Sequence, residues 1–208
     1  MNVYKLIFWD FDGVIKESIE VKTKAFLKLF DVYGADLVKR IRVHHEANGG
    51  MSRFDKFPIY LKWAGEEPNQ NKVDELCEKF KRIVFDGVIQ SQWVPGAEEY
   101  LRQNPNNQIF VLVSATPQAE MEQIIKELKL ESSFESIYGA PTSKFQAVLQ
   151  TLINLDILPH EALMIGDAKA DMNAAIDNNV PFLLRIHSSN RAIFAEYVGK
   201  SVNDLSEL

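Results

Sequence analysis

Two aspartates, Asp10 and Asp12, stand one residue apart in the stretch WDFDGV, directly after an apolar run. Two negative charges about 4 Å apart repel each other by roughly 4 kcal/mol at an effective dielectric constant near 20. Folding alone gives no reason to place them so close together. The pair therefore indicates a site that uses both carboxylates.

Other polar residues also follow apolar runs. Ser114 ends the second such run, Asp167 follows the fourth, and Asp171 comes four residues later. Lys144 stands where a helix is expected to begin, and helix starts favour anions. Ligands bind beyond the carboxyl ends of parallel strands, where such residues meet. We therefore predict one site that includes Asp10, Asp12, Ser114, Lys144, Asp167 and Asp171.

The charge of this set predicts a cation. Four aspartates and one lysine leave a formal charge of −3, which a divalent cation reduces to −1. The expected ligands are oxygen atoms, without a cysteine or histidine cluster, and this selects Mg²⁺ over zinc or copper. Mg²⁺ held by few carboxylates, with water on its other positions, is typical of sites for phosphate substrates.

Short apolar runs bounded by turn residues predict the strands that position this site. Between the later runs, apolar residues recur at helical spacing. Strands that alternate with helices indicate an α/β fold, a doubly wound parallel sheet with helices on both faces. The predicted strands are Val3–Trp9, Ile109–Val113, Ser136–Tyr138, Ala162–Ile165 and Pro181–Leu184.

Residues 17–91 break this alternation, because they contain helical stripes with no strand between them. One stripe includes Phe26 and Phe30, and another includes Val73, Cys77 and Phe80. We therefore predict two domains: an α/β core formed by residues 1–16 and 92–208, and a helical insert formed by residues 17–91.

Composition limits the class of protein. The chain has 208 residues, 46% hydrophobic residues and a net charge of −6, which is ordinary for a folded domain and argues against broad affinity for nucleic acids or anionic membranes. A single cysteine excludes an intramolecular disulfide, and no apolar window reaches the roughly 20 residues of a membrane span. We expect a cytoplasmic protein.

The chain resembles the haloacid dehalogenase (HAD) superfamily, whose four motifs occur in order. They are Asp10-Phe11-Asp12-Gly13-Val14, Ser114, Lys144 and the stretch from Gly166 to Asp171. Each motif is weak alone, but four in order at strand ends and helix starts are specific. An insert after the first motif is similar to the helical cap of phosphoglycolate phosphatases and β-phosphoglucomutases. The resemblance implies a Rossmann-like core with a cap.

The resemblance implies a role for each motif. Asp10 is the nucleophile that forms an aspartyl-phosphate, and Asp12 is the general acid and base. Ser114, the backbone N–H of Ala115 and Lys144 bind and balance the phosphoryl oxygens.

The resemblance also implies the metal ligands. Asp10, the backbone carbonyl of Asp12 and Asp167 hold Mg²⁺. Asp171 binds the metal or orients its water molecules.

Within the insert, Arg53 is the candidate for substrate contact. It follows two glycines and a serine in GGMSR, and a guanidinium binds phosphate or carboxylate in a bidentate manner. His44, His45 and Glu46 do not form a metal site in this interpretation, because adjacent side chains diverge on a helix. We assign them a surface or packing role.

These features predict a Mg²⁺-dependent phosphatase that hydrolyses the phosphate monoester of a small metabolite such as a sugar phosphate. A phosphomutase of the β-phosphoglucomutase type is the enzymatic alternative, because it would use the same residues. A non-enzymatic phospho-receiver is a third class, although it would need neither a large cap nor an acid and base at Asp12. Departures from the family pattern, such as Lys16-Glu17-Ser18, leave substrate identity, pathway and oligomeric state open.

Overall fold

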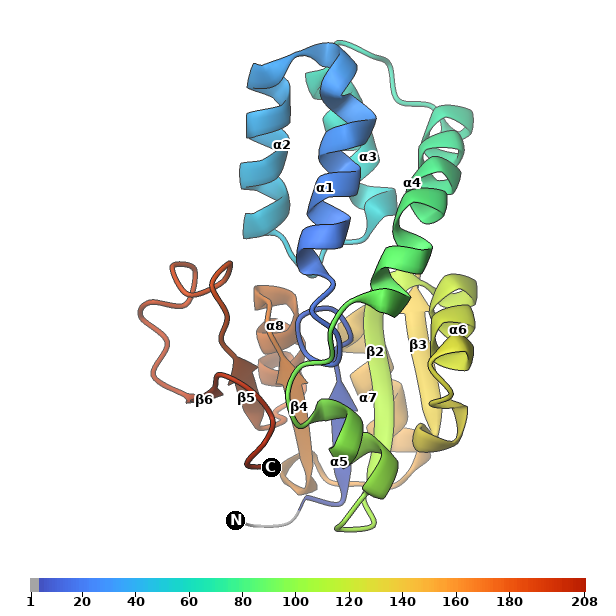
Figure 1. The fold of residues 1–208 in the computed structure, drawn as a ribbon. Helices are drawn as coiled ribbons and strands as arrows, with labels where there is room; N and C mark the ends of the chain where they lie inside the picture. Colours follow the sequence, from blue (N-terminus) through green and yellow to red (C-terminus); the bar gives the residue numbers. More distant parts are fainter. Residues whose placement is uncertain (1–3) are drawn as a thin grey trace.

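The computed structural model describes residues 4–208, which form a six-stranded parallel sheet, helices on both of its faces, and a group of helices beyond the carboxyl ends of the strands (Figure 1). This confirms the predicted doubly wound α/β class. The elements are β1 (Leu6–Trp9), α1 (Ile19–Phe30), α2 (Ala35–Ala47), α3 (Arg53–Trp63), α4 (Gln70–Gln90), α5 (Ala97–Gln103), β2 (Ile109–Pro117), α6 (Gln118–Glu127), β3 (Ser136–Ala140), α7 (Lys144–Asn154), β4 (Ala162–Gly166), α8 (Lys169–Asp177), β5 (Phe182–Arg185) and β6 (Lys200–Val202).

The first strand lies in the middle of the sheet. The strand order is β3-β2-β1-β4-β5-β6, and Leu6 pairs with Ile109 of β2 on one side and with Ala162 of β4 on the other. The chain order therefore reverses at β1, which makes its carboxyl end the switch point where α/β proteins bind ligands.

Two apolar layers cover the faces of the sheet. Ile7 and Trp9 of β1 point to the side of α5 and α6, and Leu6 and Phe8 point to the side of α7 and α8. Because successive side chains of a strand alternate between faces, four consecutive buried residues require cover on both sides. The buried LIFW run therefore fits a central strand.

The predicted strands differ from the observed ones mainly at their ends. Val3, the start of the first predicted strand, lies outside the described residues. Strand β2 continues to Pro117, with a register shift against β3 between Val113 and Pro117. The prediction missed β6, because this short strand of lysine, serine and valine has no apolar run to mark it.

Helices α1 to α4 form a separate group above the strand ends in Figure 1. Two neighbouring segments connect this group to the sheet: Lys16 pairs with Trp93, and the N–H of Glu17 donates to the carbonyl of Gln92 at 2.8 Å. The division at residues 17–91 stays a prediction.

No helix among residues 4–208 is long and apolar enough to cross a membrane.

Candidate active site

Asp10, at the carboxyl end of β1, contacts Lys144, the first residue of α7. Asp10 is buried, and its backbone N–H donates to the carbonyl of Ile165 in β4 at 3.0 Å. Lys144 begins α7 after a capping box formed by Ser143 and Gln146. Its Nζ lies 2.8 Å from Oδ1 of Asp10. The switch point and a helix start therefore bring a carboxylate and an ammonium group into direct contact.

Two further carboxylates join this pair. One oxygen each of Asp10, Asp167 and Asp171 lies within 4.8 Å of the others, and all three residues are buried. Lys144 also donates to Oδ1 of Asp171 at 2.5 Å. The backbone N–H of Ala168 donates to the other oxygen of Asp171 at 3.1 Å, which fixes that carboxylate behind the cluster.

The electrostatics of the cluster fit a divalent cation. Burial, followed by the charge of Asp171, raises the pKa of Asp10 to about 7, although Lys144 opposes the change. Burial also raises the pKa of Asp167 to about 6, against the effect of His187. For Lys144, burial lowers the pKa, but Asp10 and Asp171 outweigh it and hold the pKa above its ordinary value. One lysine thus faces three crowded oxygen donors, as expected for a site that gains a hard metal ion.

Gly13 makes room for this cluster. Its φ of +76° is in the left-handed region, and a Cβ atom built on it would lie 2.4 Å from Oδ2 of Asp167. Any side chain at this position would push Asp167 away. The absence of a side chain at Gly13 therefore allows Asp167, at the end of β4, to lie against the loop after β1.

Asp12 is held by the first helix of the insert. The hydroxyl of Ser18 donates to Oδ1 of Asp12 at 2.6 Å, and Nζ of Lys22 forms an ion pair with Oδ2. Lys22 also donates to the hydroxyl oxygen of Thr116 at 2.7 Å. The side chain of Asp12 remains about one-fifth exposed and faces the same cavity as Asp10.

The end of β2 places its residues in two neighbouring hollows. Ala115 and Thr116 line the cavity that contains Asp10 and Asp12, and Ser114 lines the adjacent one together with Ala115 and Lys144. The hydroxyl oxygen of Ser114 accepts a hydrogen bond from the backbone N–H of Thr116 at 3.1 Å. Ala115 therefore lies between the two hollows.

The segment after β5 supports Asp167 in a way that sequence analysis missed. Nε2 of His187 lies 2.9 Å from Oδ2 of Asp167. The side-chain amide of Asn190 donates to the carbonyl oxygens of Asp167 at 2.8 Å and of Arg185 at 2.9 Å. The rule that pointed to Asp167 could have found these two residues, since they follow the fifth apolar run.

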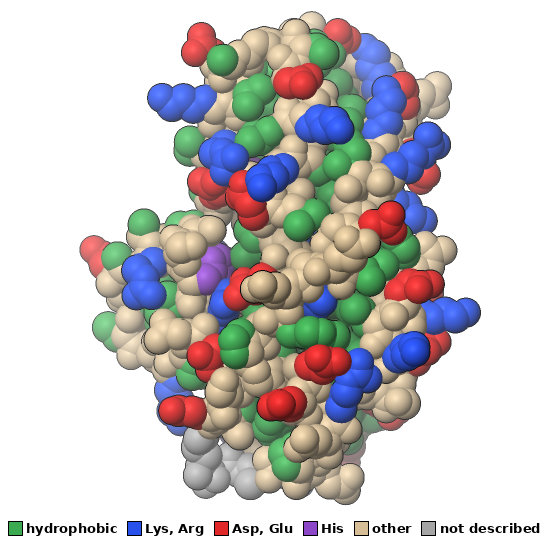
Figure 2. Space-filling view, in the orientation of Figure 1, with side chains coloured by type: hydrophobic (Ala, Val, Ile, Leu, Met, Phe, Trp, Pro, Cys, Tyr) green, Lys and Arg blue, Asp and Glu red, His purple; other side chains and the backbone are tan. Residues whose placement is uncertain are grey.

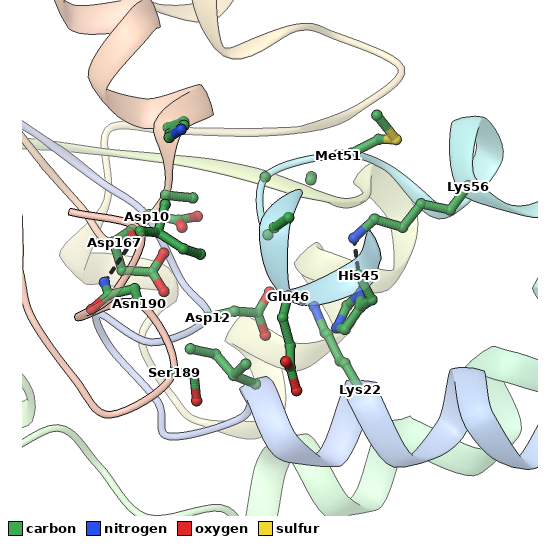
Figure 3. A pocket seen from close by; sticks show the side chains of 18 of the residues that line it. Asp10, Asp12, Lys22, His45, Glu46, Met51, Lys56, Asp167, Ser189 and Asn190 are labelled. Carbon is green, nitrogen blue, oxygen red and sulfur yellow. Dashed lines mark hydrogen bonds and ion pairs between the residues drawn. The ribbon is translucent and has the colours of Figure 1, made fainter. Parts of the chain in front are cut away.

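The insert covers the site. The cavity is lined by both parts of the chain, with Asp10, Asp12 and Asp167 on one side and His45, Glu46, Met51 and Lys56 on the other (Figure 3). A Cβ atom on Gly50 would lie 2.3 Å from the Cβ of Ala170, so the loop before α3 touches the start of α8.

On the outer face in Figure 2, positive and negative side chains are interspersed over the insert.

Arg53 lies in the cavity wall, but its charge is already paired. The guanidinium donates to Oε1 of Glu120 in α6 at 2.6 Å, and both side chains are almost completely buried. It also lies 4.5 Å above the ring of Phe80. The ion pair therefore links the insert to the core.

The adjacent histidines diverge as expected. Nδ1 of His44 lies 3.1 Å from the hydroxyl of Tyr60, whereas Nδ1 of His45 lies 2.8 Å from Nζ of Lys56. Glu46 accepts a hydrogen bond from Arg42 at 3.1 Å. The three side chains thus have three different partners and share no ligand position.

Comparisons with known proteins agree with the resemblance inferred from the motifs. The family model described as "Haloacid dehalogenase-like hydrolase" matches residues 7–184. A search of curated protein sequences gave no match.

Solved structures share the fold. A β-phosphoglucomutase from Clostridium difficile superposes with a TM-score of 0.78 at 20% identity, over 99% of this chain and 93% of that one. A predicted phosphoglycolate phosphatase from Haemophilus somnus gives a TM-score of 0.76 at 15% identity, over 100% and 97%. A mutant of CbbY from Rhodobacter sphaeroides, in complex with xylulose-(1,5)bisphosphate, gives 0.79 at 13% identity, over 99% and 96%.

Proposed function

Because the chain belongs to the family of haloacid dehalogenase-like hydrolases, we propose that it is a Mg²⁺-dependent phosphatase that hydrolyses the phosphate monoester of a small metabolite. The observation that carries the proposal is the meeting of Asp10, Lys144 and Asp167 at the switch point of the sheet, with Asp12 held beside them. A sugar phosphate is the proposed kind of substrate. Two fold neighbours, a phosphoglucomutase and a protein solved with a sugar bisphosphate, are consistent with it.

Asp10 is the proposed nucleophile. A carboxylate oxygen of Asp10 bonds to phosphorus while the bond between phosphorus and the leaving oxygen breaks, which gives an aspartyl-phosphate and an alcohol. Lys144 lies 2.8 Å from Asp10, so its ammonium group can follow the negative charge from the carboxylate to the phosphoryl oxygens. Ser114 and the backbone N–H of Ala115 are the proposed donors to those oxygens.

Asp12 is the proposed acid and base. It gives its proton to the leaving alkoxide, then takes a proton from the water that attacks phosphorus and releases phosphate and free Asp10. Ser18 and Lys22 hold the two carboxylate oxygens of Asp12 and keep it aimed into the cavity. The two like charges of the first motif can stand one residue apart because each carboxylate has its own cation: Lys144 for Asp10 and Lys22 for Asp12.

The cluster of Asp10, Asp167 and the backbone carbonyl of Asp12 is the proposed Mg²⁺ site, with Asp171 behind it. When bound, the ion would neutralise the buried carboxylates and polarise the phosphoryl group. Asn190 and His187 hold Asp167 in place from the segment after β5. Arg53 stays a candidate for substrate contact, although its guanidinium pairs with Glu120 in the structure.

Turnover of p-nitrophenyl phosphate tests this function. We expect steady release of phosphate in the presence of Mg²⁺, loss of release in Asp10→Asn, and normal release in Asp86→Asn, whose side chain is exposed on α4. In Asp12→Asn, one equivalent of p-nitrophenol should be released quickly, because this leaving group needs no proton, and later turnover should fall about 10²-fold or more. Normal steady turnover in Asp10→Asn would refute the proposal.

Two alternatives make different predictions in the same assay. A phosphomutase would convert a sugar phosphate to its isomer with little free phosphate. A phospho-receiver would be phosphorylated once on Asp10 and would not turn over. Both use a strand-end aspartate and a lysine, but the position of Asp12 between Ser18 and Lys22 favours an enzyme with an acid and base.

A further inference from the structure

Lys56 is a buried lysine in the wall of the active-site cavity. It lies in the second turn of α3, its relative exposure is 1%, and it lines the cavity together with Asp10 and Asp12. Figure 3 shows its side chain reaching from α3 to His45, on the opposite side of the cavity from Asp10 and Asp167. The amine therefore faces the region that a substrate would fill beyond its phosphoryl group.

Lys56 differs from Lys22, Arg53 and Lys144, the other cations of this wall that are not exposed, because it has no carboxylate partner. Arg53 pairs with Glu120, and Lys22 pairs with Asp12. Among residues 4–208, Lys56 forms no ion pair, and its hydrogen-bond partner is Nδ1 of His45 at 2.8 Å. Burial, followed by the charge of Lys22, lowers the pKa of Lys56 to about 7, and the charge of Asp12, which does not contact the amine, opposes this only in part.

His45 keeps the amine in place without neutralising it. Burial and the charge of Lys56 hold the pKa of His45 well below its usual range, so the ring is neutral and accepts at Nδ1. Phe26 packs against this ring, with centroids 4.8 Å apart. A lysine has three N–H donors, and His45 takes one of them. The others are left for a ligand.

Packing does not account for this arrangement. The ring of Phe26 lies 5.5 Å from Nζ of Lys56, near the outer limit of about 6 Å for a cation–π contact. Buried charges in folded proteins are normally paired, and leaving one unpaired is costly. An anion supplied from outside the chain would provide the missing partner.

We propose that the substrate carries a second anionic group, a carboxylate or a second phosphate, and that Lys56 binds this group while the phosphate ester lies at Asp10. This inference depends on the proposed phosphatase function and narrows its substrate class. His45 is a positioning residue for Lys56. Phosphorylated metabolites without a second anion are then poor substrates, because they leave the ammonium group of Lys56 unpaired in the occupied cavity.

A matched series of substrates tests the proposal in the presence of Mg²⁺. The probes are straight-chain carboxylic acids of two to four carbons with a terminal phosphate ester, their primary amides, and the bisphosphates and monophosphates of diols of the same lengths. The acid and amide of one length differ in charge but little in shape. Comparing acids with bisphosphates separates the two sources of negative charge.

We expect wild-type kcat/KM for the best acid or bisphosphate to exceed that of its neutral partner by about tenfold or more. In Lys56→Met, this preference should disappear, so that the charged and neutral probes have similar kcat/KM values when each is normalised to the same variant's turnover of p-nitrophenyl phosphate. The control is Lys62→Met, on the same helix but exposed, which should keep the wild-type preference. A circular dichroism spectrum of each variant confirms that it is folded.

The outcomes separate the two proposals. If the wild type hydrolyses p-nitrophenyl phosphate but treats acid, bisphosphate and neutral probes alike, the second-anion subsite is refuted and the phosphatase function stands. The same holds if Lys56→Met keeps the full preference. If the wild type hydrolyses no probe at all, the phosphatase function fails, and the subsite fails with it.

Discussion

Replacing Lys56 by methionine should stabilise the folded chain near neutral pH. The amine of Lys56 is almost completely buried, and its pKa falls from the ordinary 10.5 to about 7. The unfolded chain therefore binds this proton more tightly than the folded chain does. The resulting penalty on folding is complete below about pH 7 and disappears as the pH rises toward 10.5.

The size of the effect follows from the two pKa values. At about 1.4 kcal/mol for each tenfold change in proton affinity, the penalty is about 4 kcal/mol at pH 7 and about 1 kcal/mol at pH 10. Removing the hydrogen bond to His45 costs about 1 kcal/mol at either pH. Lys56→Met should therefore be more stable than the wild type by about 3 kcal/mol at pH 7 and nearly equal to it at pH 10.

Urea denaturation of the metal-free protein, followed by tryptophan fluorescence at pH 7 and pH 10, measures this difference. The exposed Lys62→Met is the control and should change the free energy of unfolding by no more than about 0.5 kcal/mol at both values. Two results would refute the reasoning: a wild type more stable than Lys56→Met at pH 7, or a difference that stays constant between the two pH values. Either would mean that Lys56 is paired or solvated.

Three other predictions concern the contacts around the site. Arg53→Met and Glu120→Gln should each destabilise the chain by about 3 kcal/mol, because each variant leaves a buried partner unpaired. If the double variant lost more free energy of unfolding than the two single variants together, this result would contradict the buried ion pair at 2.6 Å. Asn190→Ala should weaken Mg²⁺ binding about 10- to 100-fold in a thermal-shift titration, because the side-chain amide of Asn190 holds the backbone of Asp167. Unchanged Mg²⁺ binding would show that Asp167 needs no such support. Gly13→Ala should abolish phosphatase turnover, because the added methyl group would displace Asp167. The control Gly34→Ala, at a positive φ with open space around it, should affect stability more than turnover. An active Gly13→Ala enzyme would contradict the close approach of Asp167 to Gly13.

The sequence predicted the fold and the family correctly because both depend on local patterns. An apolar run ends at Trp9, and the first polar residue after it must lie at a strand end. Parallel strands place all such ends together, so Asp10 and Asp167 could be expected to meet without knowledge of any distance. The oxygen-rich composition of the same cluster indicated a divalent metal, and the structure has the buried carboxylates to hold one.

The partners of the side chains at the site were beyond the reach of the sequence. Ser18 and Lys22 hold Asp12 because α1 rises from the strand ends of the sheet (Figure 1), and no pattern in the sequence fixes the direction of that helix. His187 reaches Asp167 across 20 residues, through a segment without regular spacing. Such contacts depend on how whole elements pack.

The pairing of charges is the clearest case. Arg53 and Lys56 are three residues apart on one helix, and the sequence alone favoured Arg53 for substrate contact. The fold brings the carboxylate of Glu120 in α6, 67 residues away in the chain, to Arg53, whereas the hydrogen-bond partner of Lys56 is the neutral ring of His45. Local sequence therefore determined where charged side chains occur along the chain and where the strands end. Tertiary structure decided which charges are neutralised, because an ion pair depends on distance in space and not on distance along the chain.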